Sequence, residues 1–435
     1  MNKLGLVFFP AFDWAISPTH PERQERLLYT RDQIVEEGIL DLPGIAEYKP
    51  RLAEYADVTR VHIGVPDIRE LITAAHLVSA GGAITAAASV VKKEVKRAFA
   101  LVRPPGHHAM RVVHGTRGFC TINIEAIMVE HLRRHYGIRR VAIVDTDVHH
   151  GDGTQDVFYH DPDTLFISFH QDGRTLYPGT GFIDEMGSPN AFGTTINIPL
   201  PPGTGDEGLH YVLDHLILPV LADFKPDIVI NSAGQDNHYS DPLANMAITA
   251  QGYASMAAKL QADIAVLEGG YSIEAALPYV NVGIILAMAG WSYAKVVEPD
   301  IGRCPAQSAE ITAYIGQLVE QWKDIWLNRH HLSCREKARA GEFWQRKRNI
   351  YYDESGISEH QVETVKLCAH CAGYFTVATQ ADRSGCPSGF AAVIPRGACR
   401  FCRQAAREAI VAARRQGRYQ HYFLQDKDQD IFEKL

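Results

Sequence analysis

The sequence predicts an α/β protein in which an open parallel sheet flanked by helices is followed by a small C-terminal zinc-binding domain. Three observations predict it. Short apolar runs end in polar residues, as strands buried on both faces of a parallel sheet do. Segments with apolar residues at helical spacing lie between these runs. Four cysteines in two CxxC pairs stand near the end of the chain, where this alternation has stopped.

The chain is long enough for two units. Its 435 residues exceed the roughly 250–300 residues at which single cores stop growing. We therefore predict a catalytic domain over residues 1–334 and a helical, cysteine-containing module over residues 335–435. The composition, 46% hydrophobic and 22% charged, is typical of soluble proteins. The net charge of -8 argues against a chain that coats nucleic acid with its whole surface.

The N-terminal segment and the cysteines indicate the cellular compartment that we expect for the protein. Pro10 cuts the first apolar run short, so that run is too brief for a secretory signal. CxxC pairs indicate reduced thiols that hold a metal, and we expect a cytoplasmic protein. The uncharged stretch 275–294 is long enough to raise the question of a membrane span. It contains Pro278 and Asn281 and follows a polar loop, so we favour a buried helix and no membrane contact.

Five strand-like runs lead into polar segments. They are AFALV (98–102), VAIV (141–144), TLFISF (164–169), DIVIN (227–231) and IAVLE (264–268). Helical patterns cover 83–99, 124–136, 209–224 and 248–261. In open parallel sheets, ligands bind beyond the carboxyl ends of the strands. We therefore expect the polar segments to form one site at that edge.

Three residues suggest a metal at this edge. Asp147 and His149 follow the run 141–144, and Asp241 lies in GQDNHYSDP. Two carboxylates and one imidazole suit Zn²⁺, and three protein ligands leave a position open for chemistry. His107 and His108 in RPPGHHA add groups that handle protons. Together these residues suggest hydrolysis by a metal-activated water.

Seven motifs in this order carry a family resemblance. They are HPERQERL, RPPGHHA, RGFCTIN, DTDVHHGDGTQDVFY, YPGTG, GQDNHYSDP and LEGGYS. Between about residues 10 and 330 the chain closely resembles the histone deacetylase superfamily, in its class II-like and bacterial form. The resemblance implies an arginase/deacetylase-like sheet and zinc-dependent removal of an acyl group from an amine.

The resemblance also implies individual roles. His108 is the principal acid/base and His107 is its partner. His107 pairs with Asp145, and His108 pairs with Asp152. Tyr271 in LEGGYS is the hydroxyl that stabilises the oxyanion.

A narrow substrate slot follows from the same resemblance. Phe119 and Tyr177 form its walls, with Gly118 and Gly270 beside them, although both aromatic residues could instead belong to the core. Tyr177 stands where most of the family has phenylalanine. The insertion MRVVHGTR (110–117) differs from relatives, and we expect it at the mouth, either meeting an anionic substrate or as a solvated loop.

The family also implies a K⁺ ion held in the loop of Asp145, Asp147 and His149, together with Ser168 and the carbonyl group of Phe169. A hard cation among carboxylate and carbonyl oxygens is chemically reasonable.

The last hundred residues depart from the family. We expect YYDESGISEH (351–360) to be a linker. Cys368, Cys371, Cys399 and Cys402 predict a structural Zn²⁺ in a zinc-ribbon or treble-clef-like unit, with the second pair opening a helix. The alternatives are free cysteines, or Cys386 or His370 as a replacement ligand.

Seven arginines give the end of the chain a basic face. They are Arg396, Arg400, Arg403, Arg407, Arg414, Arg415 and Arg418. We favour a helix that docks on the catalytic domain or mediates formation of a homo-oligomer over one that binds nucleic acid or a protein partner.

The sequence therefore predicts a zinc-dependent amidohydrolase acting on the acylated ε-amine of lysine in proteins or peptides, with Fe²⁺ as an alternative metal. Two other functions stay open: an acetylpolyamine amidohydrolase, and a non-catalytic binder that acts through the zinc module.

Overall fold

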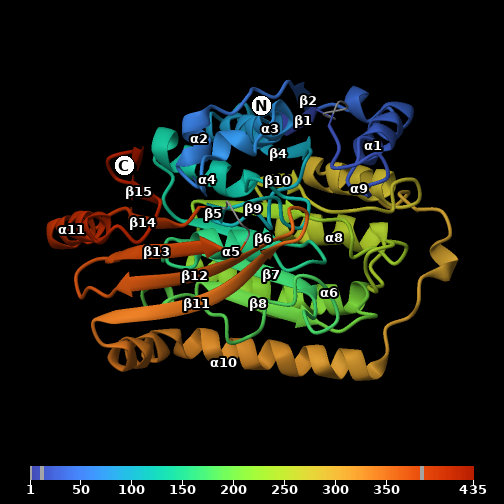
Figure 1. Cartoon of the computed structure of the whole chain (residues 1–435). Coiled ribbons are helices and arrows are strands. Elements are labelled where there is room, and N and C mark those ends of the chain that lie inside the picture. Colours follow the sequence, from blue (N-terminus) through green and yellow to red (C-terminus); the bar gives the residue numbers. More distant parts are fainter. Residues whose placement is uncertain (1, 10–13, 383–386) are drawn as a thin grey trace.

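A computed structural model describes residues 2–9, 14–382 and 387–435 (Figure 1). Eight parallel strands form one sheet in the spatial order β2-β1-β4-β10-β9-β6-β7-β8. In chain order they are β1 (Asn2–Phe9), β2 (Ile45–Tyr48), β4 (Val95–Val102), β6 (Val141–Asp145), β7 (Thr164–Gln171), β8 (Thr195–Leu200), β9 (Ile228–Ala233) and β10 (Ile264–Leu267). The predicted fold class is confirmed, and all five predicted strands belong to this sheet.

Helices cover both faces of the sheet. They are α1 (Glu25–Glu36), α2 (Tyr55–Thr59), α3 (Ala74–Val91), α4 (Ile124–Tyr136), α5 (Asp152–Phe158), α6 (Asp206–Val212), α7 (Leu218–Phe224), α8 (Ala250–Leu260), α9 (Leu277–Ala289) and α10 (Ala309–Ala340). Because side chains alternate along a strand, each strand supplies both layers. On β4, Ala98 and Ala100 pack beneath α3 and α4, whereas Phe99 and Leu101 pack beneath α8 and α9.

The predicted helix over 83–99 is wrong in its second half. Helix α3 ends at Val91, and β4 begins at Val95. Lys93 between them has φ 60°, a left-handed conformation that ends the helix. The β-branched and aromatic residues that follow pair with β1 and β10 on either side.

The apolar stretch 275–294 contains helix α9, which is short and largely buried. A different helix, α3, is long and apolar enough to cross a membrane by length and composition alone, and 61% of its apolar window is buried in the fold.

The C-terminal module is built on a second sheet of six strands in sequential order. They are β11 (Phe343–Tyr352), β12 (Ile357–Lys366), β13 (Tyr374–Ala381), β14 (Gly389–Ile394), β15 (His421–Asp426) and β16 (Ile431–Lys434). Only β14 and β15 pair in parallel, and α11 (Arg400–Gln416) connects them. The predicted linker 351–360 is wrong: these residues form the turn and inner ends of the β11–β12 hairpin. The predicted boundary at 334/335 falls inside α10.

The two faces of this second sheet have different partners. Ala392, Ile394 and Leu424 pack against α11. Ala391 and Val393, one residue out of phase with the first set, face the catalytic part. There they meet a two-stranded sheet of β3 (Ile63–Gly64) and β5 (Val112–Val113). The module is therefore docked through a shared apolar core.

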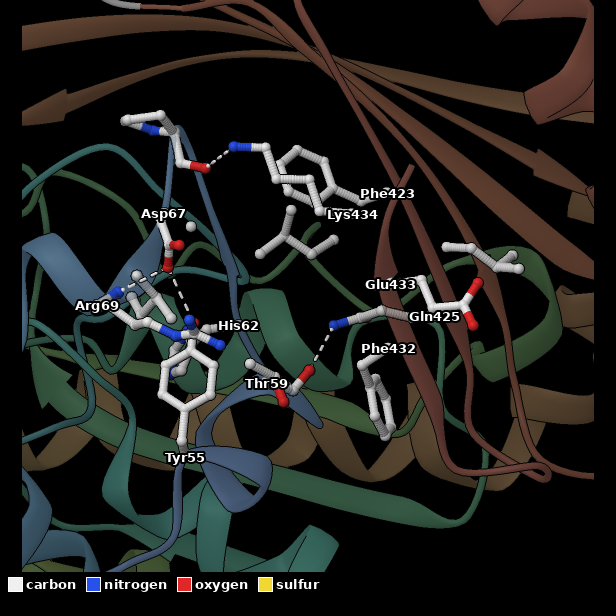
Figure 2. A pocket seen from close by; sticks show the side chains of 15 residues that line it. Tyr55, Thr59, His62, Asp67, Arg69, Phe423, Gln425, Phe432, Glu433 and Lys434 are labelled. Carbon is white, nitrogen blue, oxygen red and sulfur yellow. Dashed lines mark hydrogen bonds between the residues drawn. The ribbon is translucent and has the colours of Figure 1, made fainter.

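The insertion 110–117 lies beneath this docked module. Val112 and Val113 are buried in β5, and Arg111 and Arg117 are also buried. The expectation of a solvated loop is wrong, because the module covers the segment. The seam also contains a cavity of about 150 Å³, where Lys434 donates to the Pro66 carbonyl (2.8 Å) and Gln425 to the Thr59 carbonyl (3.0 Å) (Figure 2).

Candidate active site and cysteine cluster

Four neighbouring strands bring the candidate residues together. Strands β4, β10, β9 and β6 are adjacent in the sheet, and the loops that follow their carboxyl ends carry RPPGHH, EGGYS, GQDNHYSD and TDVHHGD. Because these strands are parallel, all four loops meet at one edge. The predicted site at this edge is present.

A compact group of possible metal ligands lies at the centre. Ligand atoms of Asp147, His149 and Asp236 lie within 4.8 Å of one another, and all three residues are buried. Nδ1 of His149 is 3.1 Å from Oδ1 of Asp147 and 3.2 Å from Oδ2 of Asp236. A Cβ at Gly269 would stand 2.1 Å from Asp236 Oδ2 and 2.5 Å from Asp147 Oδ2, so glycine is required here.

Asp241 does not belong to this compact group, in contrast to the predicted trio. Its carboxylate accepts backbone N–H groups of Leu243 (3.0 Å), Tyr271 (2.7 Å) and Ser272 (3.1 Å). Burial and the charge of Asp236 raise the pKa of Asp241 to about 7. Sequence reasoning missed Asp236, although this residue follows β9 closely in the same GQDNHYSDP motif.

The donor set fits a divalent cation. Burial and the charge of Asp147 raise the pKa of Asp236 above its usual range. Burial also raises the pKa of nearby Asp145. Burial and mutual repulsion disfavour the ionised form of these carboxyl groups, and the positive charge of a bound metal would stabilise that form. Carboxylate oxygens with an imidazole nitrogen are suitable ligands for zinc.

Both predicted histidine–carboxylate contacts are present. Nδ1 of His107 is 3.1 Å from Asp145 Oδ2, and Nδ1 of His108 is 2.7 Å from Asp152 Oδ1. Burial opposes the charge of His107, but Asp147 and Asp145 raise its pKa to about 10. Burial and the charge of His107 lower the pKa of His108 to about 3. At neutral pH and without metal, His108 is therefore the neutral member of the pair.

Arg117 belongs to the insertion 110–117, which the sequence predicts at the mouth, either meeting an anionic substrate or as a solvated loop. The structure instead directs it at Asp152: Nε and Nη2 lie 3.1 and 2.6 Å from Oδ2. Burial opposes ionisation of Asp152, yet Arg117 and His108 hold its pKa well below the usual range. Asp152 thus stays charged.

Aromatic rings lie beside His108 and Tyr271. The ring of Tyr177 lies 5.2 Å from that of His108, and the ring of Phe119 lies 5.6 Å from that of Tyr271. Burial raises the pKa of Tyr271 well above its usual value, so its hydroxyl stays a proton donor. Gly118 has φ 51°, and a Cβ there would stand 2.4 Å from His108 Cδ2. Gly270 directs its carbonyl group at Arg26 Nε (2.8 Å).

Comparisons with known proteins agree with this geometry. A family model described as "Histone deacetylase domain" matches residues 67–282. A "Probable deacetylase" of Archaeoglobus fulgidus is 48% identical over 324 residues, which cover 68% of this chain and 89% of the relative. The chain belongs to the histone deacetylase family.

Other members of the histone deacetylase family match over shorter spans. "Histone deacetylase 14, chloroplastic" of Arabidopsis thaliana is 46% identical over 185 residues, covering 40% of this chain and 43% of the relative. The chain thus matches less than half of that protein's length. The solved structure of an HDA15 HD domain superposes with a TM-score of 0.65 at 27% identity, covering 78% of this chain and 99% of that one.

The residues predicted to bind K⁺ lie at the carboxyl ends of β6 and β7. Asp145 and Ser168 are paired in register on β6 and β7. Asp145 Oδ1 accepts the Asp147 N–H (3.1 Å), and Ser168 Oγ lies 2.9 Å from His170 Nδ1. Phe169 is buried beside them.

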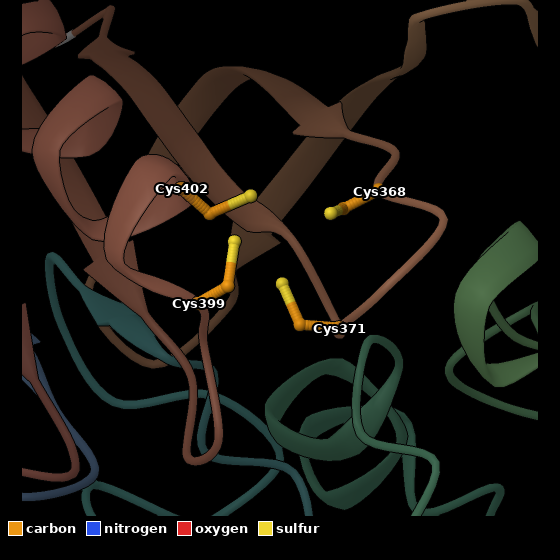
Figure 3. A group of neighbouring side chains, drawn as sticks. All are labelled: Cys368, Cys371, Cys399 and Cys402. Atoms are coloured by element: carbon orange, nitrogen blue, oxygen red, sulfur yellow. The ribbon is translucent and has the colours of Figure 1, made fainter.

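The C-terminal cysteines lie outside the span that the histone deacetylase family model matches. Sulfur atoms of Cys368, Cys371, Cys399 and Cys402 lie within 4.8 Å of one another, which confirms the predicted cluster (Figure 3). The first pair lies between β12 and β13, and the second begins α11 as predicted. Four sulfur ligands in this arrangement suit a structural zinc.

The alternative ligands do not change this assignment. His370 is exposed and does not belong to the group of four. Cys386 lies outside the described residues. Hydrogen bonding from the Cys402 N–H lowers the pKa of Cys399 to about 7, whereas burial raises the pKa of Cys371 and of Cys402.

Proposed function

We propose that the chain is a zinc-dependent deacetylase that hydrolyses the amide of an acylated primary amine, such as the ε-acetyl-lysine of a protein or peptide. The observation that carries the proposal is the convergence of two histidine–carboxylate pairs and the Asp147/His149/Asp236 group at one sheet edge, where the loop after β10 also carries Tyr271. No single loop supplies these groups, so their meeting reflects the whole fold.

Asp147 and His149 would hold the metal, with a third carboxylate from the loop 234–241. When bound, Zn²⁺ supplies a Lewis acid that acidifies water and polarises an acyl carbonyl. We also propose the K⁺ site of Asp145, Ser168 and Phe169, because the carboxylate, hydroxyl and carbonyl oxygens of these residues suit a hard cation.

The side chains have separate roles in the proposed hydrolysis. Neutral His108 accepts a proton from water as the water oxygen attacks the acyl carbon. The Tyr271 hydroxyl donates to the carbonyl oxygen as negative charge develops there. The accepted proton passes to the amide nitrogen, the C–N bond breaks, and an amine and a carboxylic acid leave. The acid then gives up its proton in solution. Asp145 and Asp152 orient the two imidazoles throughout.

Acetyl-lysine peptides, acetylputrescine and acetylspermidine, each assayed for acetate release by zinc-loaded protein, test the proposal. We expect hydrolysis that a chelator abolishes and added zinc restores. Preference for the two small amines would favour the acetylpolyamine amidohydrolase. Zinc-loaded protein that hydrolyses none of them would overturn the proposal and favour the non-catalytic binder.

A further inference from the structure

The turn between β11 and β12 lies on the rim of the candidate active site. Asp353 Oδ1 accepts the Gly118 N–H (3.0 Å) and the Tyr177 hydroxyl (3.2 Å). Both partners border the predicted slot, and Gly118 is pressed against the His108 ring. One carboxylate of the C-terminal module therefore holds Gly118 and Tyr177 beside a candidate catalytic histidine. In Figure 1 the orange hairpin extends from the module toward the centre of the molecule.

Residues around Asp353 reach the same rim. The Tyr351 carbonyl accepts from Arg117, which also binds Asp152. Ser355 Oγ accepts the Thr116 N–H (3.0 Å). The turn and the adjoining end of β11 thus contact three successive residues, Thr116 to Gly118, and form part of this rim.

Glu354 contacts the side of the predicted slot opposite Tyr177. Its Oε1 lies 3.5 Å from His20 Nε2, and the His20 ring packs on Phe119 with 4.3 Å between ring centres. The turn therefore reaches both aromatic walls of the slot: Tyr177 through Asp353, and Phe119 through His20.

The turn makes the rim negative. Asp353 and Glu354 bring two carboxylates, and the donors on Asp353 are an uncharged N–H and an uncharged hydroxyl. The charge of Arg117 attracts Asp353, but its guanidinium is already paired with Asp152. Among the residues that the structure describes, no lysine or arginine forms an ion pair with Asp353 or Glu354.

We infer that this turn is a specificity element, which selects acylated primary amines that carry a further positive charge a short distance beyond the amide. The inference rests on the proposed function and names its substrate class. A cleft with walls of low polarity and one sign of charge attracts a ligand of the opposite sign. Such a substrate is either a free acylated polyamine or an acylated lysine beside basic residues in a peptide.

A matched pair of small substrates tests the inference. Acetylputrescine and N-pentylacetamide have similar length, but only the first ends in an ammonium group. We expect kcat/KM to favour acetylputrescine roughly tenfold at low salt, and the preference to shrink as added salt screens the rim. Asp353→Asn and Glu354→Gln should each lower this ratio, whatever their absolute rates.

Glu433→Gln is the control, because it removes the same charge from β16 at the opposite edge of the module's sheet. It should keep the wild-type ratio. Acetyl-lysine peptides flanked by arginine or by neutral citrulline form the second arm. A charge preference only in the small-molecule arm identifies a polyamine substrate, and one in the peptide arm identifies a basic peptide.

Two results would overturn the inference. One is equal kcat/KM of the wild type for the charged and neutral members of both pairs. The other is a ratio that stays unchanged in Asp353→Asn and Glu354→Gln while both rates fall, because the turn would then only support the rim. Failure of the proposed function is distinct: zinc-loaded wild type would hydrolyse no member of either pair.

Discussion

The Asp152 carboxylate determines which nitrogen of His108 can act as the base. His108 contacts its Oδ1, and Arg117 binds its Oδ2. Because Arg117 keeps Asp152 ionised, Nδ1 of His108 carries the proton of their hydrogen bond, and Nε2 keeps a free lone pair. The sequence motif predicts the histidine and its carboxylate, whereas the role of Arg117 depends on how the insertion 110–117 folds.

Replacing His108 tests the assigned base. We expect His108→Ala to lower kcat by about 10²–10⁴-fold, because the water loses its proton acceptor. Zinc content and melting temperature should change little, since His108 is not in the metal group. His215→Ala, at an exposed histidine on the helix between α6 and α7, is the control and should retain wild-type kcat. An active His108→Ala enzyme would assign the base elsewhere.

Replacing the carboxylates tests the metal ligands. We expect Asp147→Asn to lose bound zinc, because Asp147 belongs both to the trio that the resemblance implies and to the trio that the structure brings together. Asp236→Asn and Asp241→Asn separate the two trios. Loss of a metal ligand should lower the zinc affinity more than loss of a carboxylate that only orients a ligand, which lowers it about 10–100-fold. Metal analysis of purified variants measures this. Full zinc retention in Asp147→Asn would contradict the site.

At the scale of elements, the C-terminal module shows which helices and strands the spacing of apolar residues predicts and which it does not. Helix α11 was expected from its composition, and it buries Cys402, Ala406, Ile410 and Ala413 at helical spacing. Residues 351–360, at the centre of the β11–β12 hairpin, are predicted to be a linker from the sequence. In the fold, Arg348 binds Asp156, and Tyr352 donates to the Val112 carbonyl (2.7 Å). Partners on the catalytic part therefore make this polar hairpin an ordered element.

The basic face of the module has a similar explanation. Arg396 pairs with Glu130, and Arg403 and Arg407 pair with Asp426. Arg396 therefore helps to dock the module on the catalytic part, whereas Arg403 and Arg407 pair with an acid of the module itself.

The cysteine cluster gives a prediction at this scale. We expect the wild type to bind two zinc ions per chain and the double variant Cys399→Ser, Cys402→Ser to bind one. The variant should also melt at a lower temperature, because the cluster ties the start of α11 to the β12–β13 loop. Cys334→Ser, at an exposed cysteine of α10, should keep both metals. Equal metal content in the double variant would show that the cluster holds no zinc.

At the scale of the whole molecule, buried ion pairs join the two parts. Arg60 binds both Asp57 of the catalytic part and Asp430 of the module. Glu130 binds Arg396 and Lys427 across the same seam. Burial opposes the charge of Glu130, but Lys427 and Arg396 hold its pKa well below the usual range. The seam therefore depends on ionised carboxylates.

Acid should weaken this seam. Burial opposes ionisation of Asp57, but hydrogen bonds from His131 and Glu54 and the charge of Arg51 lower its pKa to about 2. A carboxylate whose pKa is lowered by folding stabilises the protein above its unfolded pKa, near 4, and loses that contribution as pH falls toward 2. For Asp57 this contribution is about 2 kcal/mol.

Urea unfolding at steps from pH 5 to pH 2 measures the effect. We expect the free energy of unfolding to fall with pH in the wild type and to fall less steeply in Asp57→Asn, which starts lower at pH 5. Asp184→Asn, at an exposed carboxylate, should keep the wild-type slope. Identical slopes in the wild type and Asp57→Asn would exclude this contribution.

By itself, the sequence determined the α/β class, the sheet edge that carries the site, the two histidine–carboxylate pairs and the four clustered cysteines. The class, the sheet edge and the cysteines depend on local pattern or on parallel strands that present their carboxyl ends together, whereas the two pairs are implied by the resemblance to the histone deacetylase family. Only the tertiary structure decided that Asp236 lies with Asp147 and His149, that Arg117 binds Asp152, and that the module's hairpin contacts Gly118 and Tyr177. Those contacts join residues from separate loops and from two sheets, and such packing has no period or spacing along the chain.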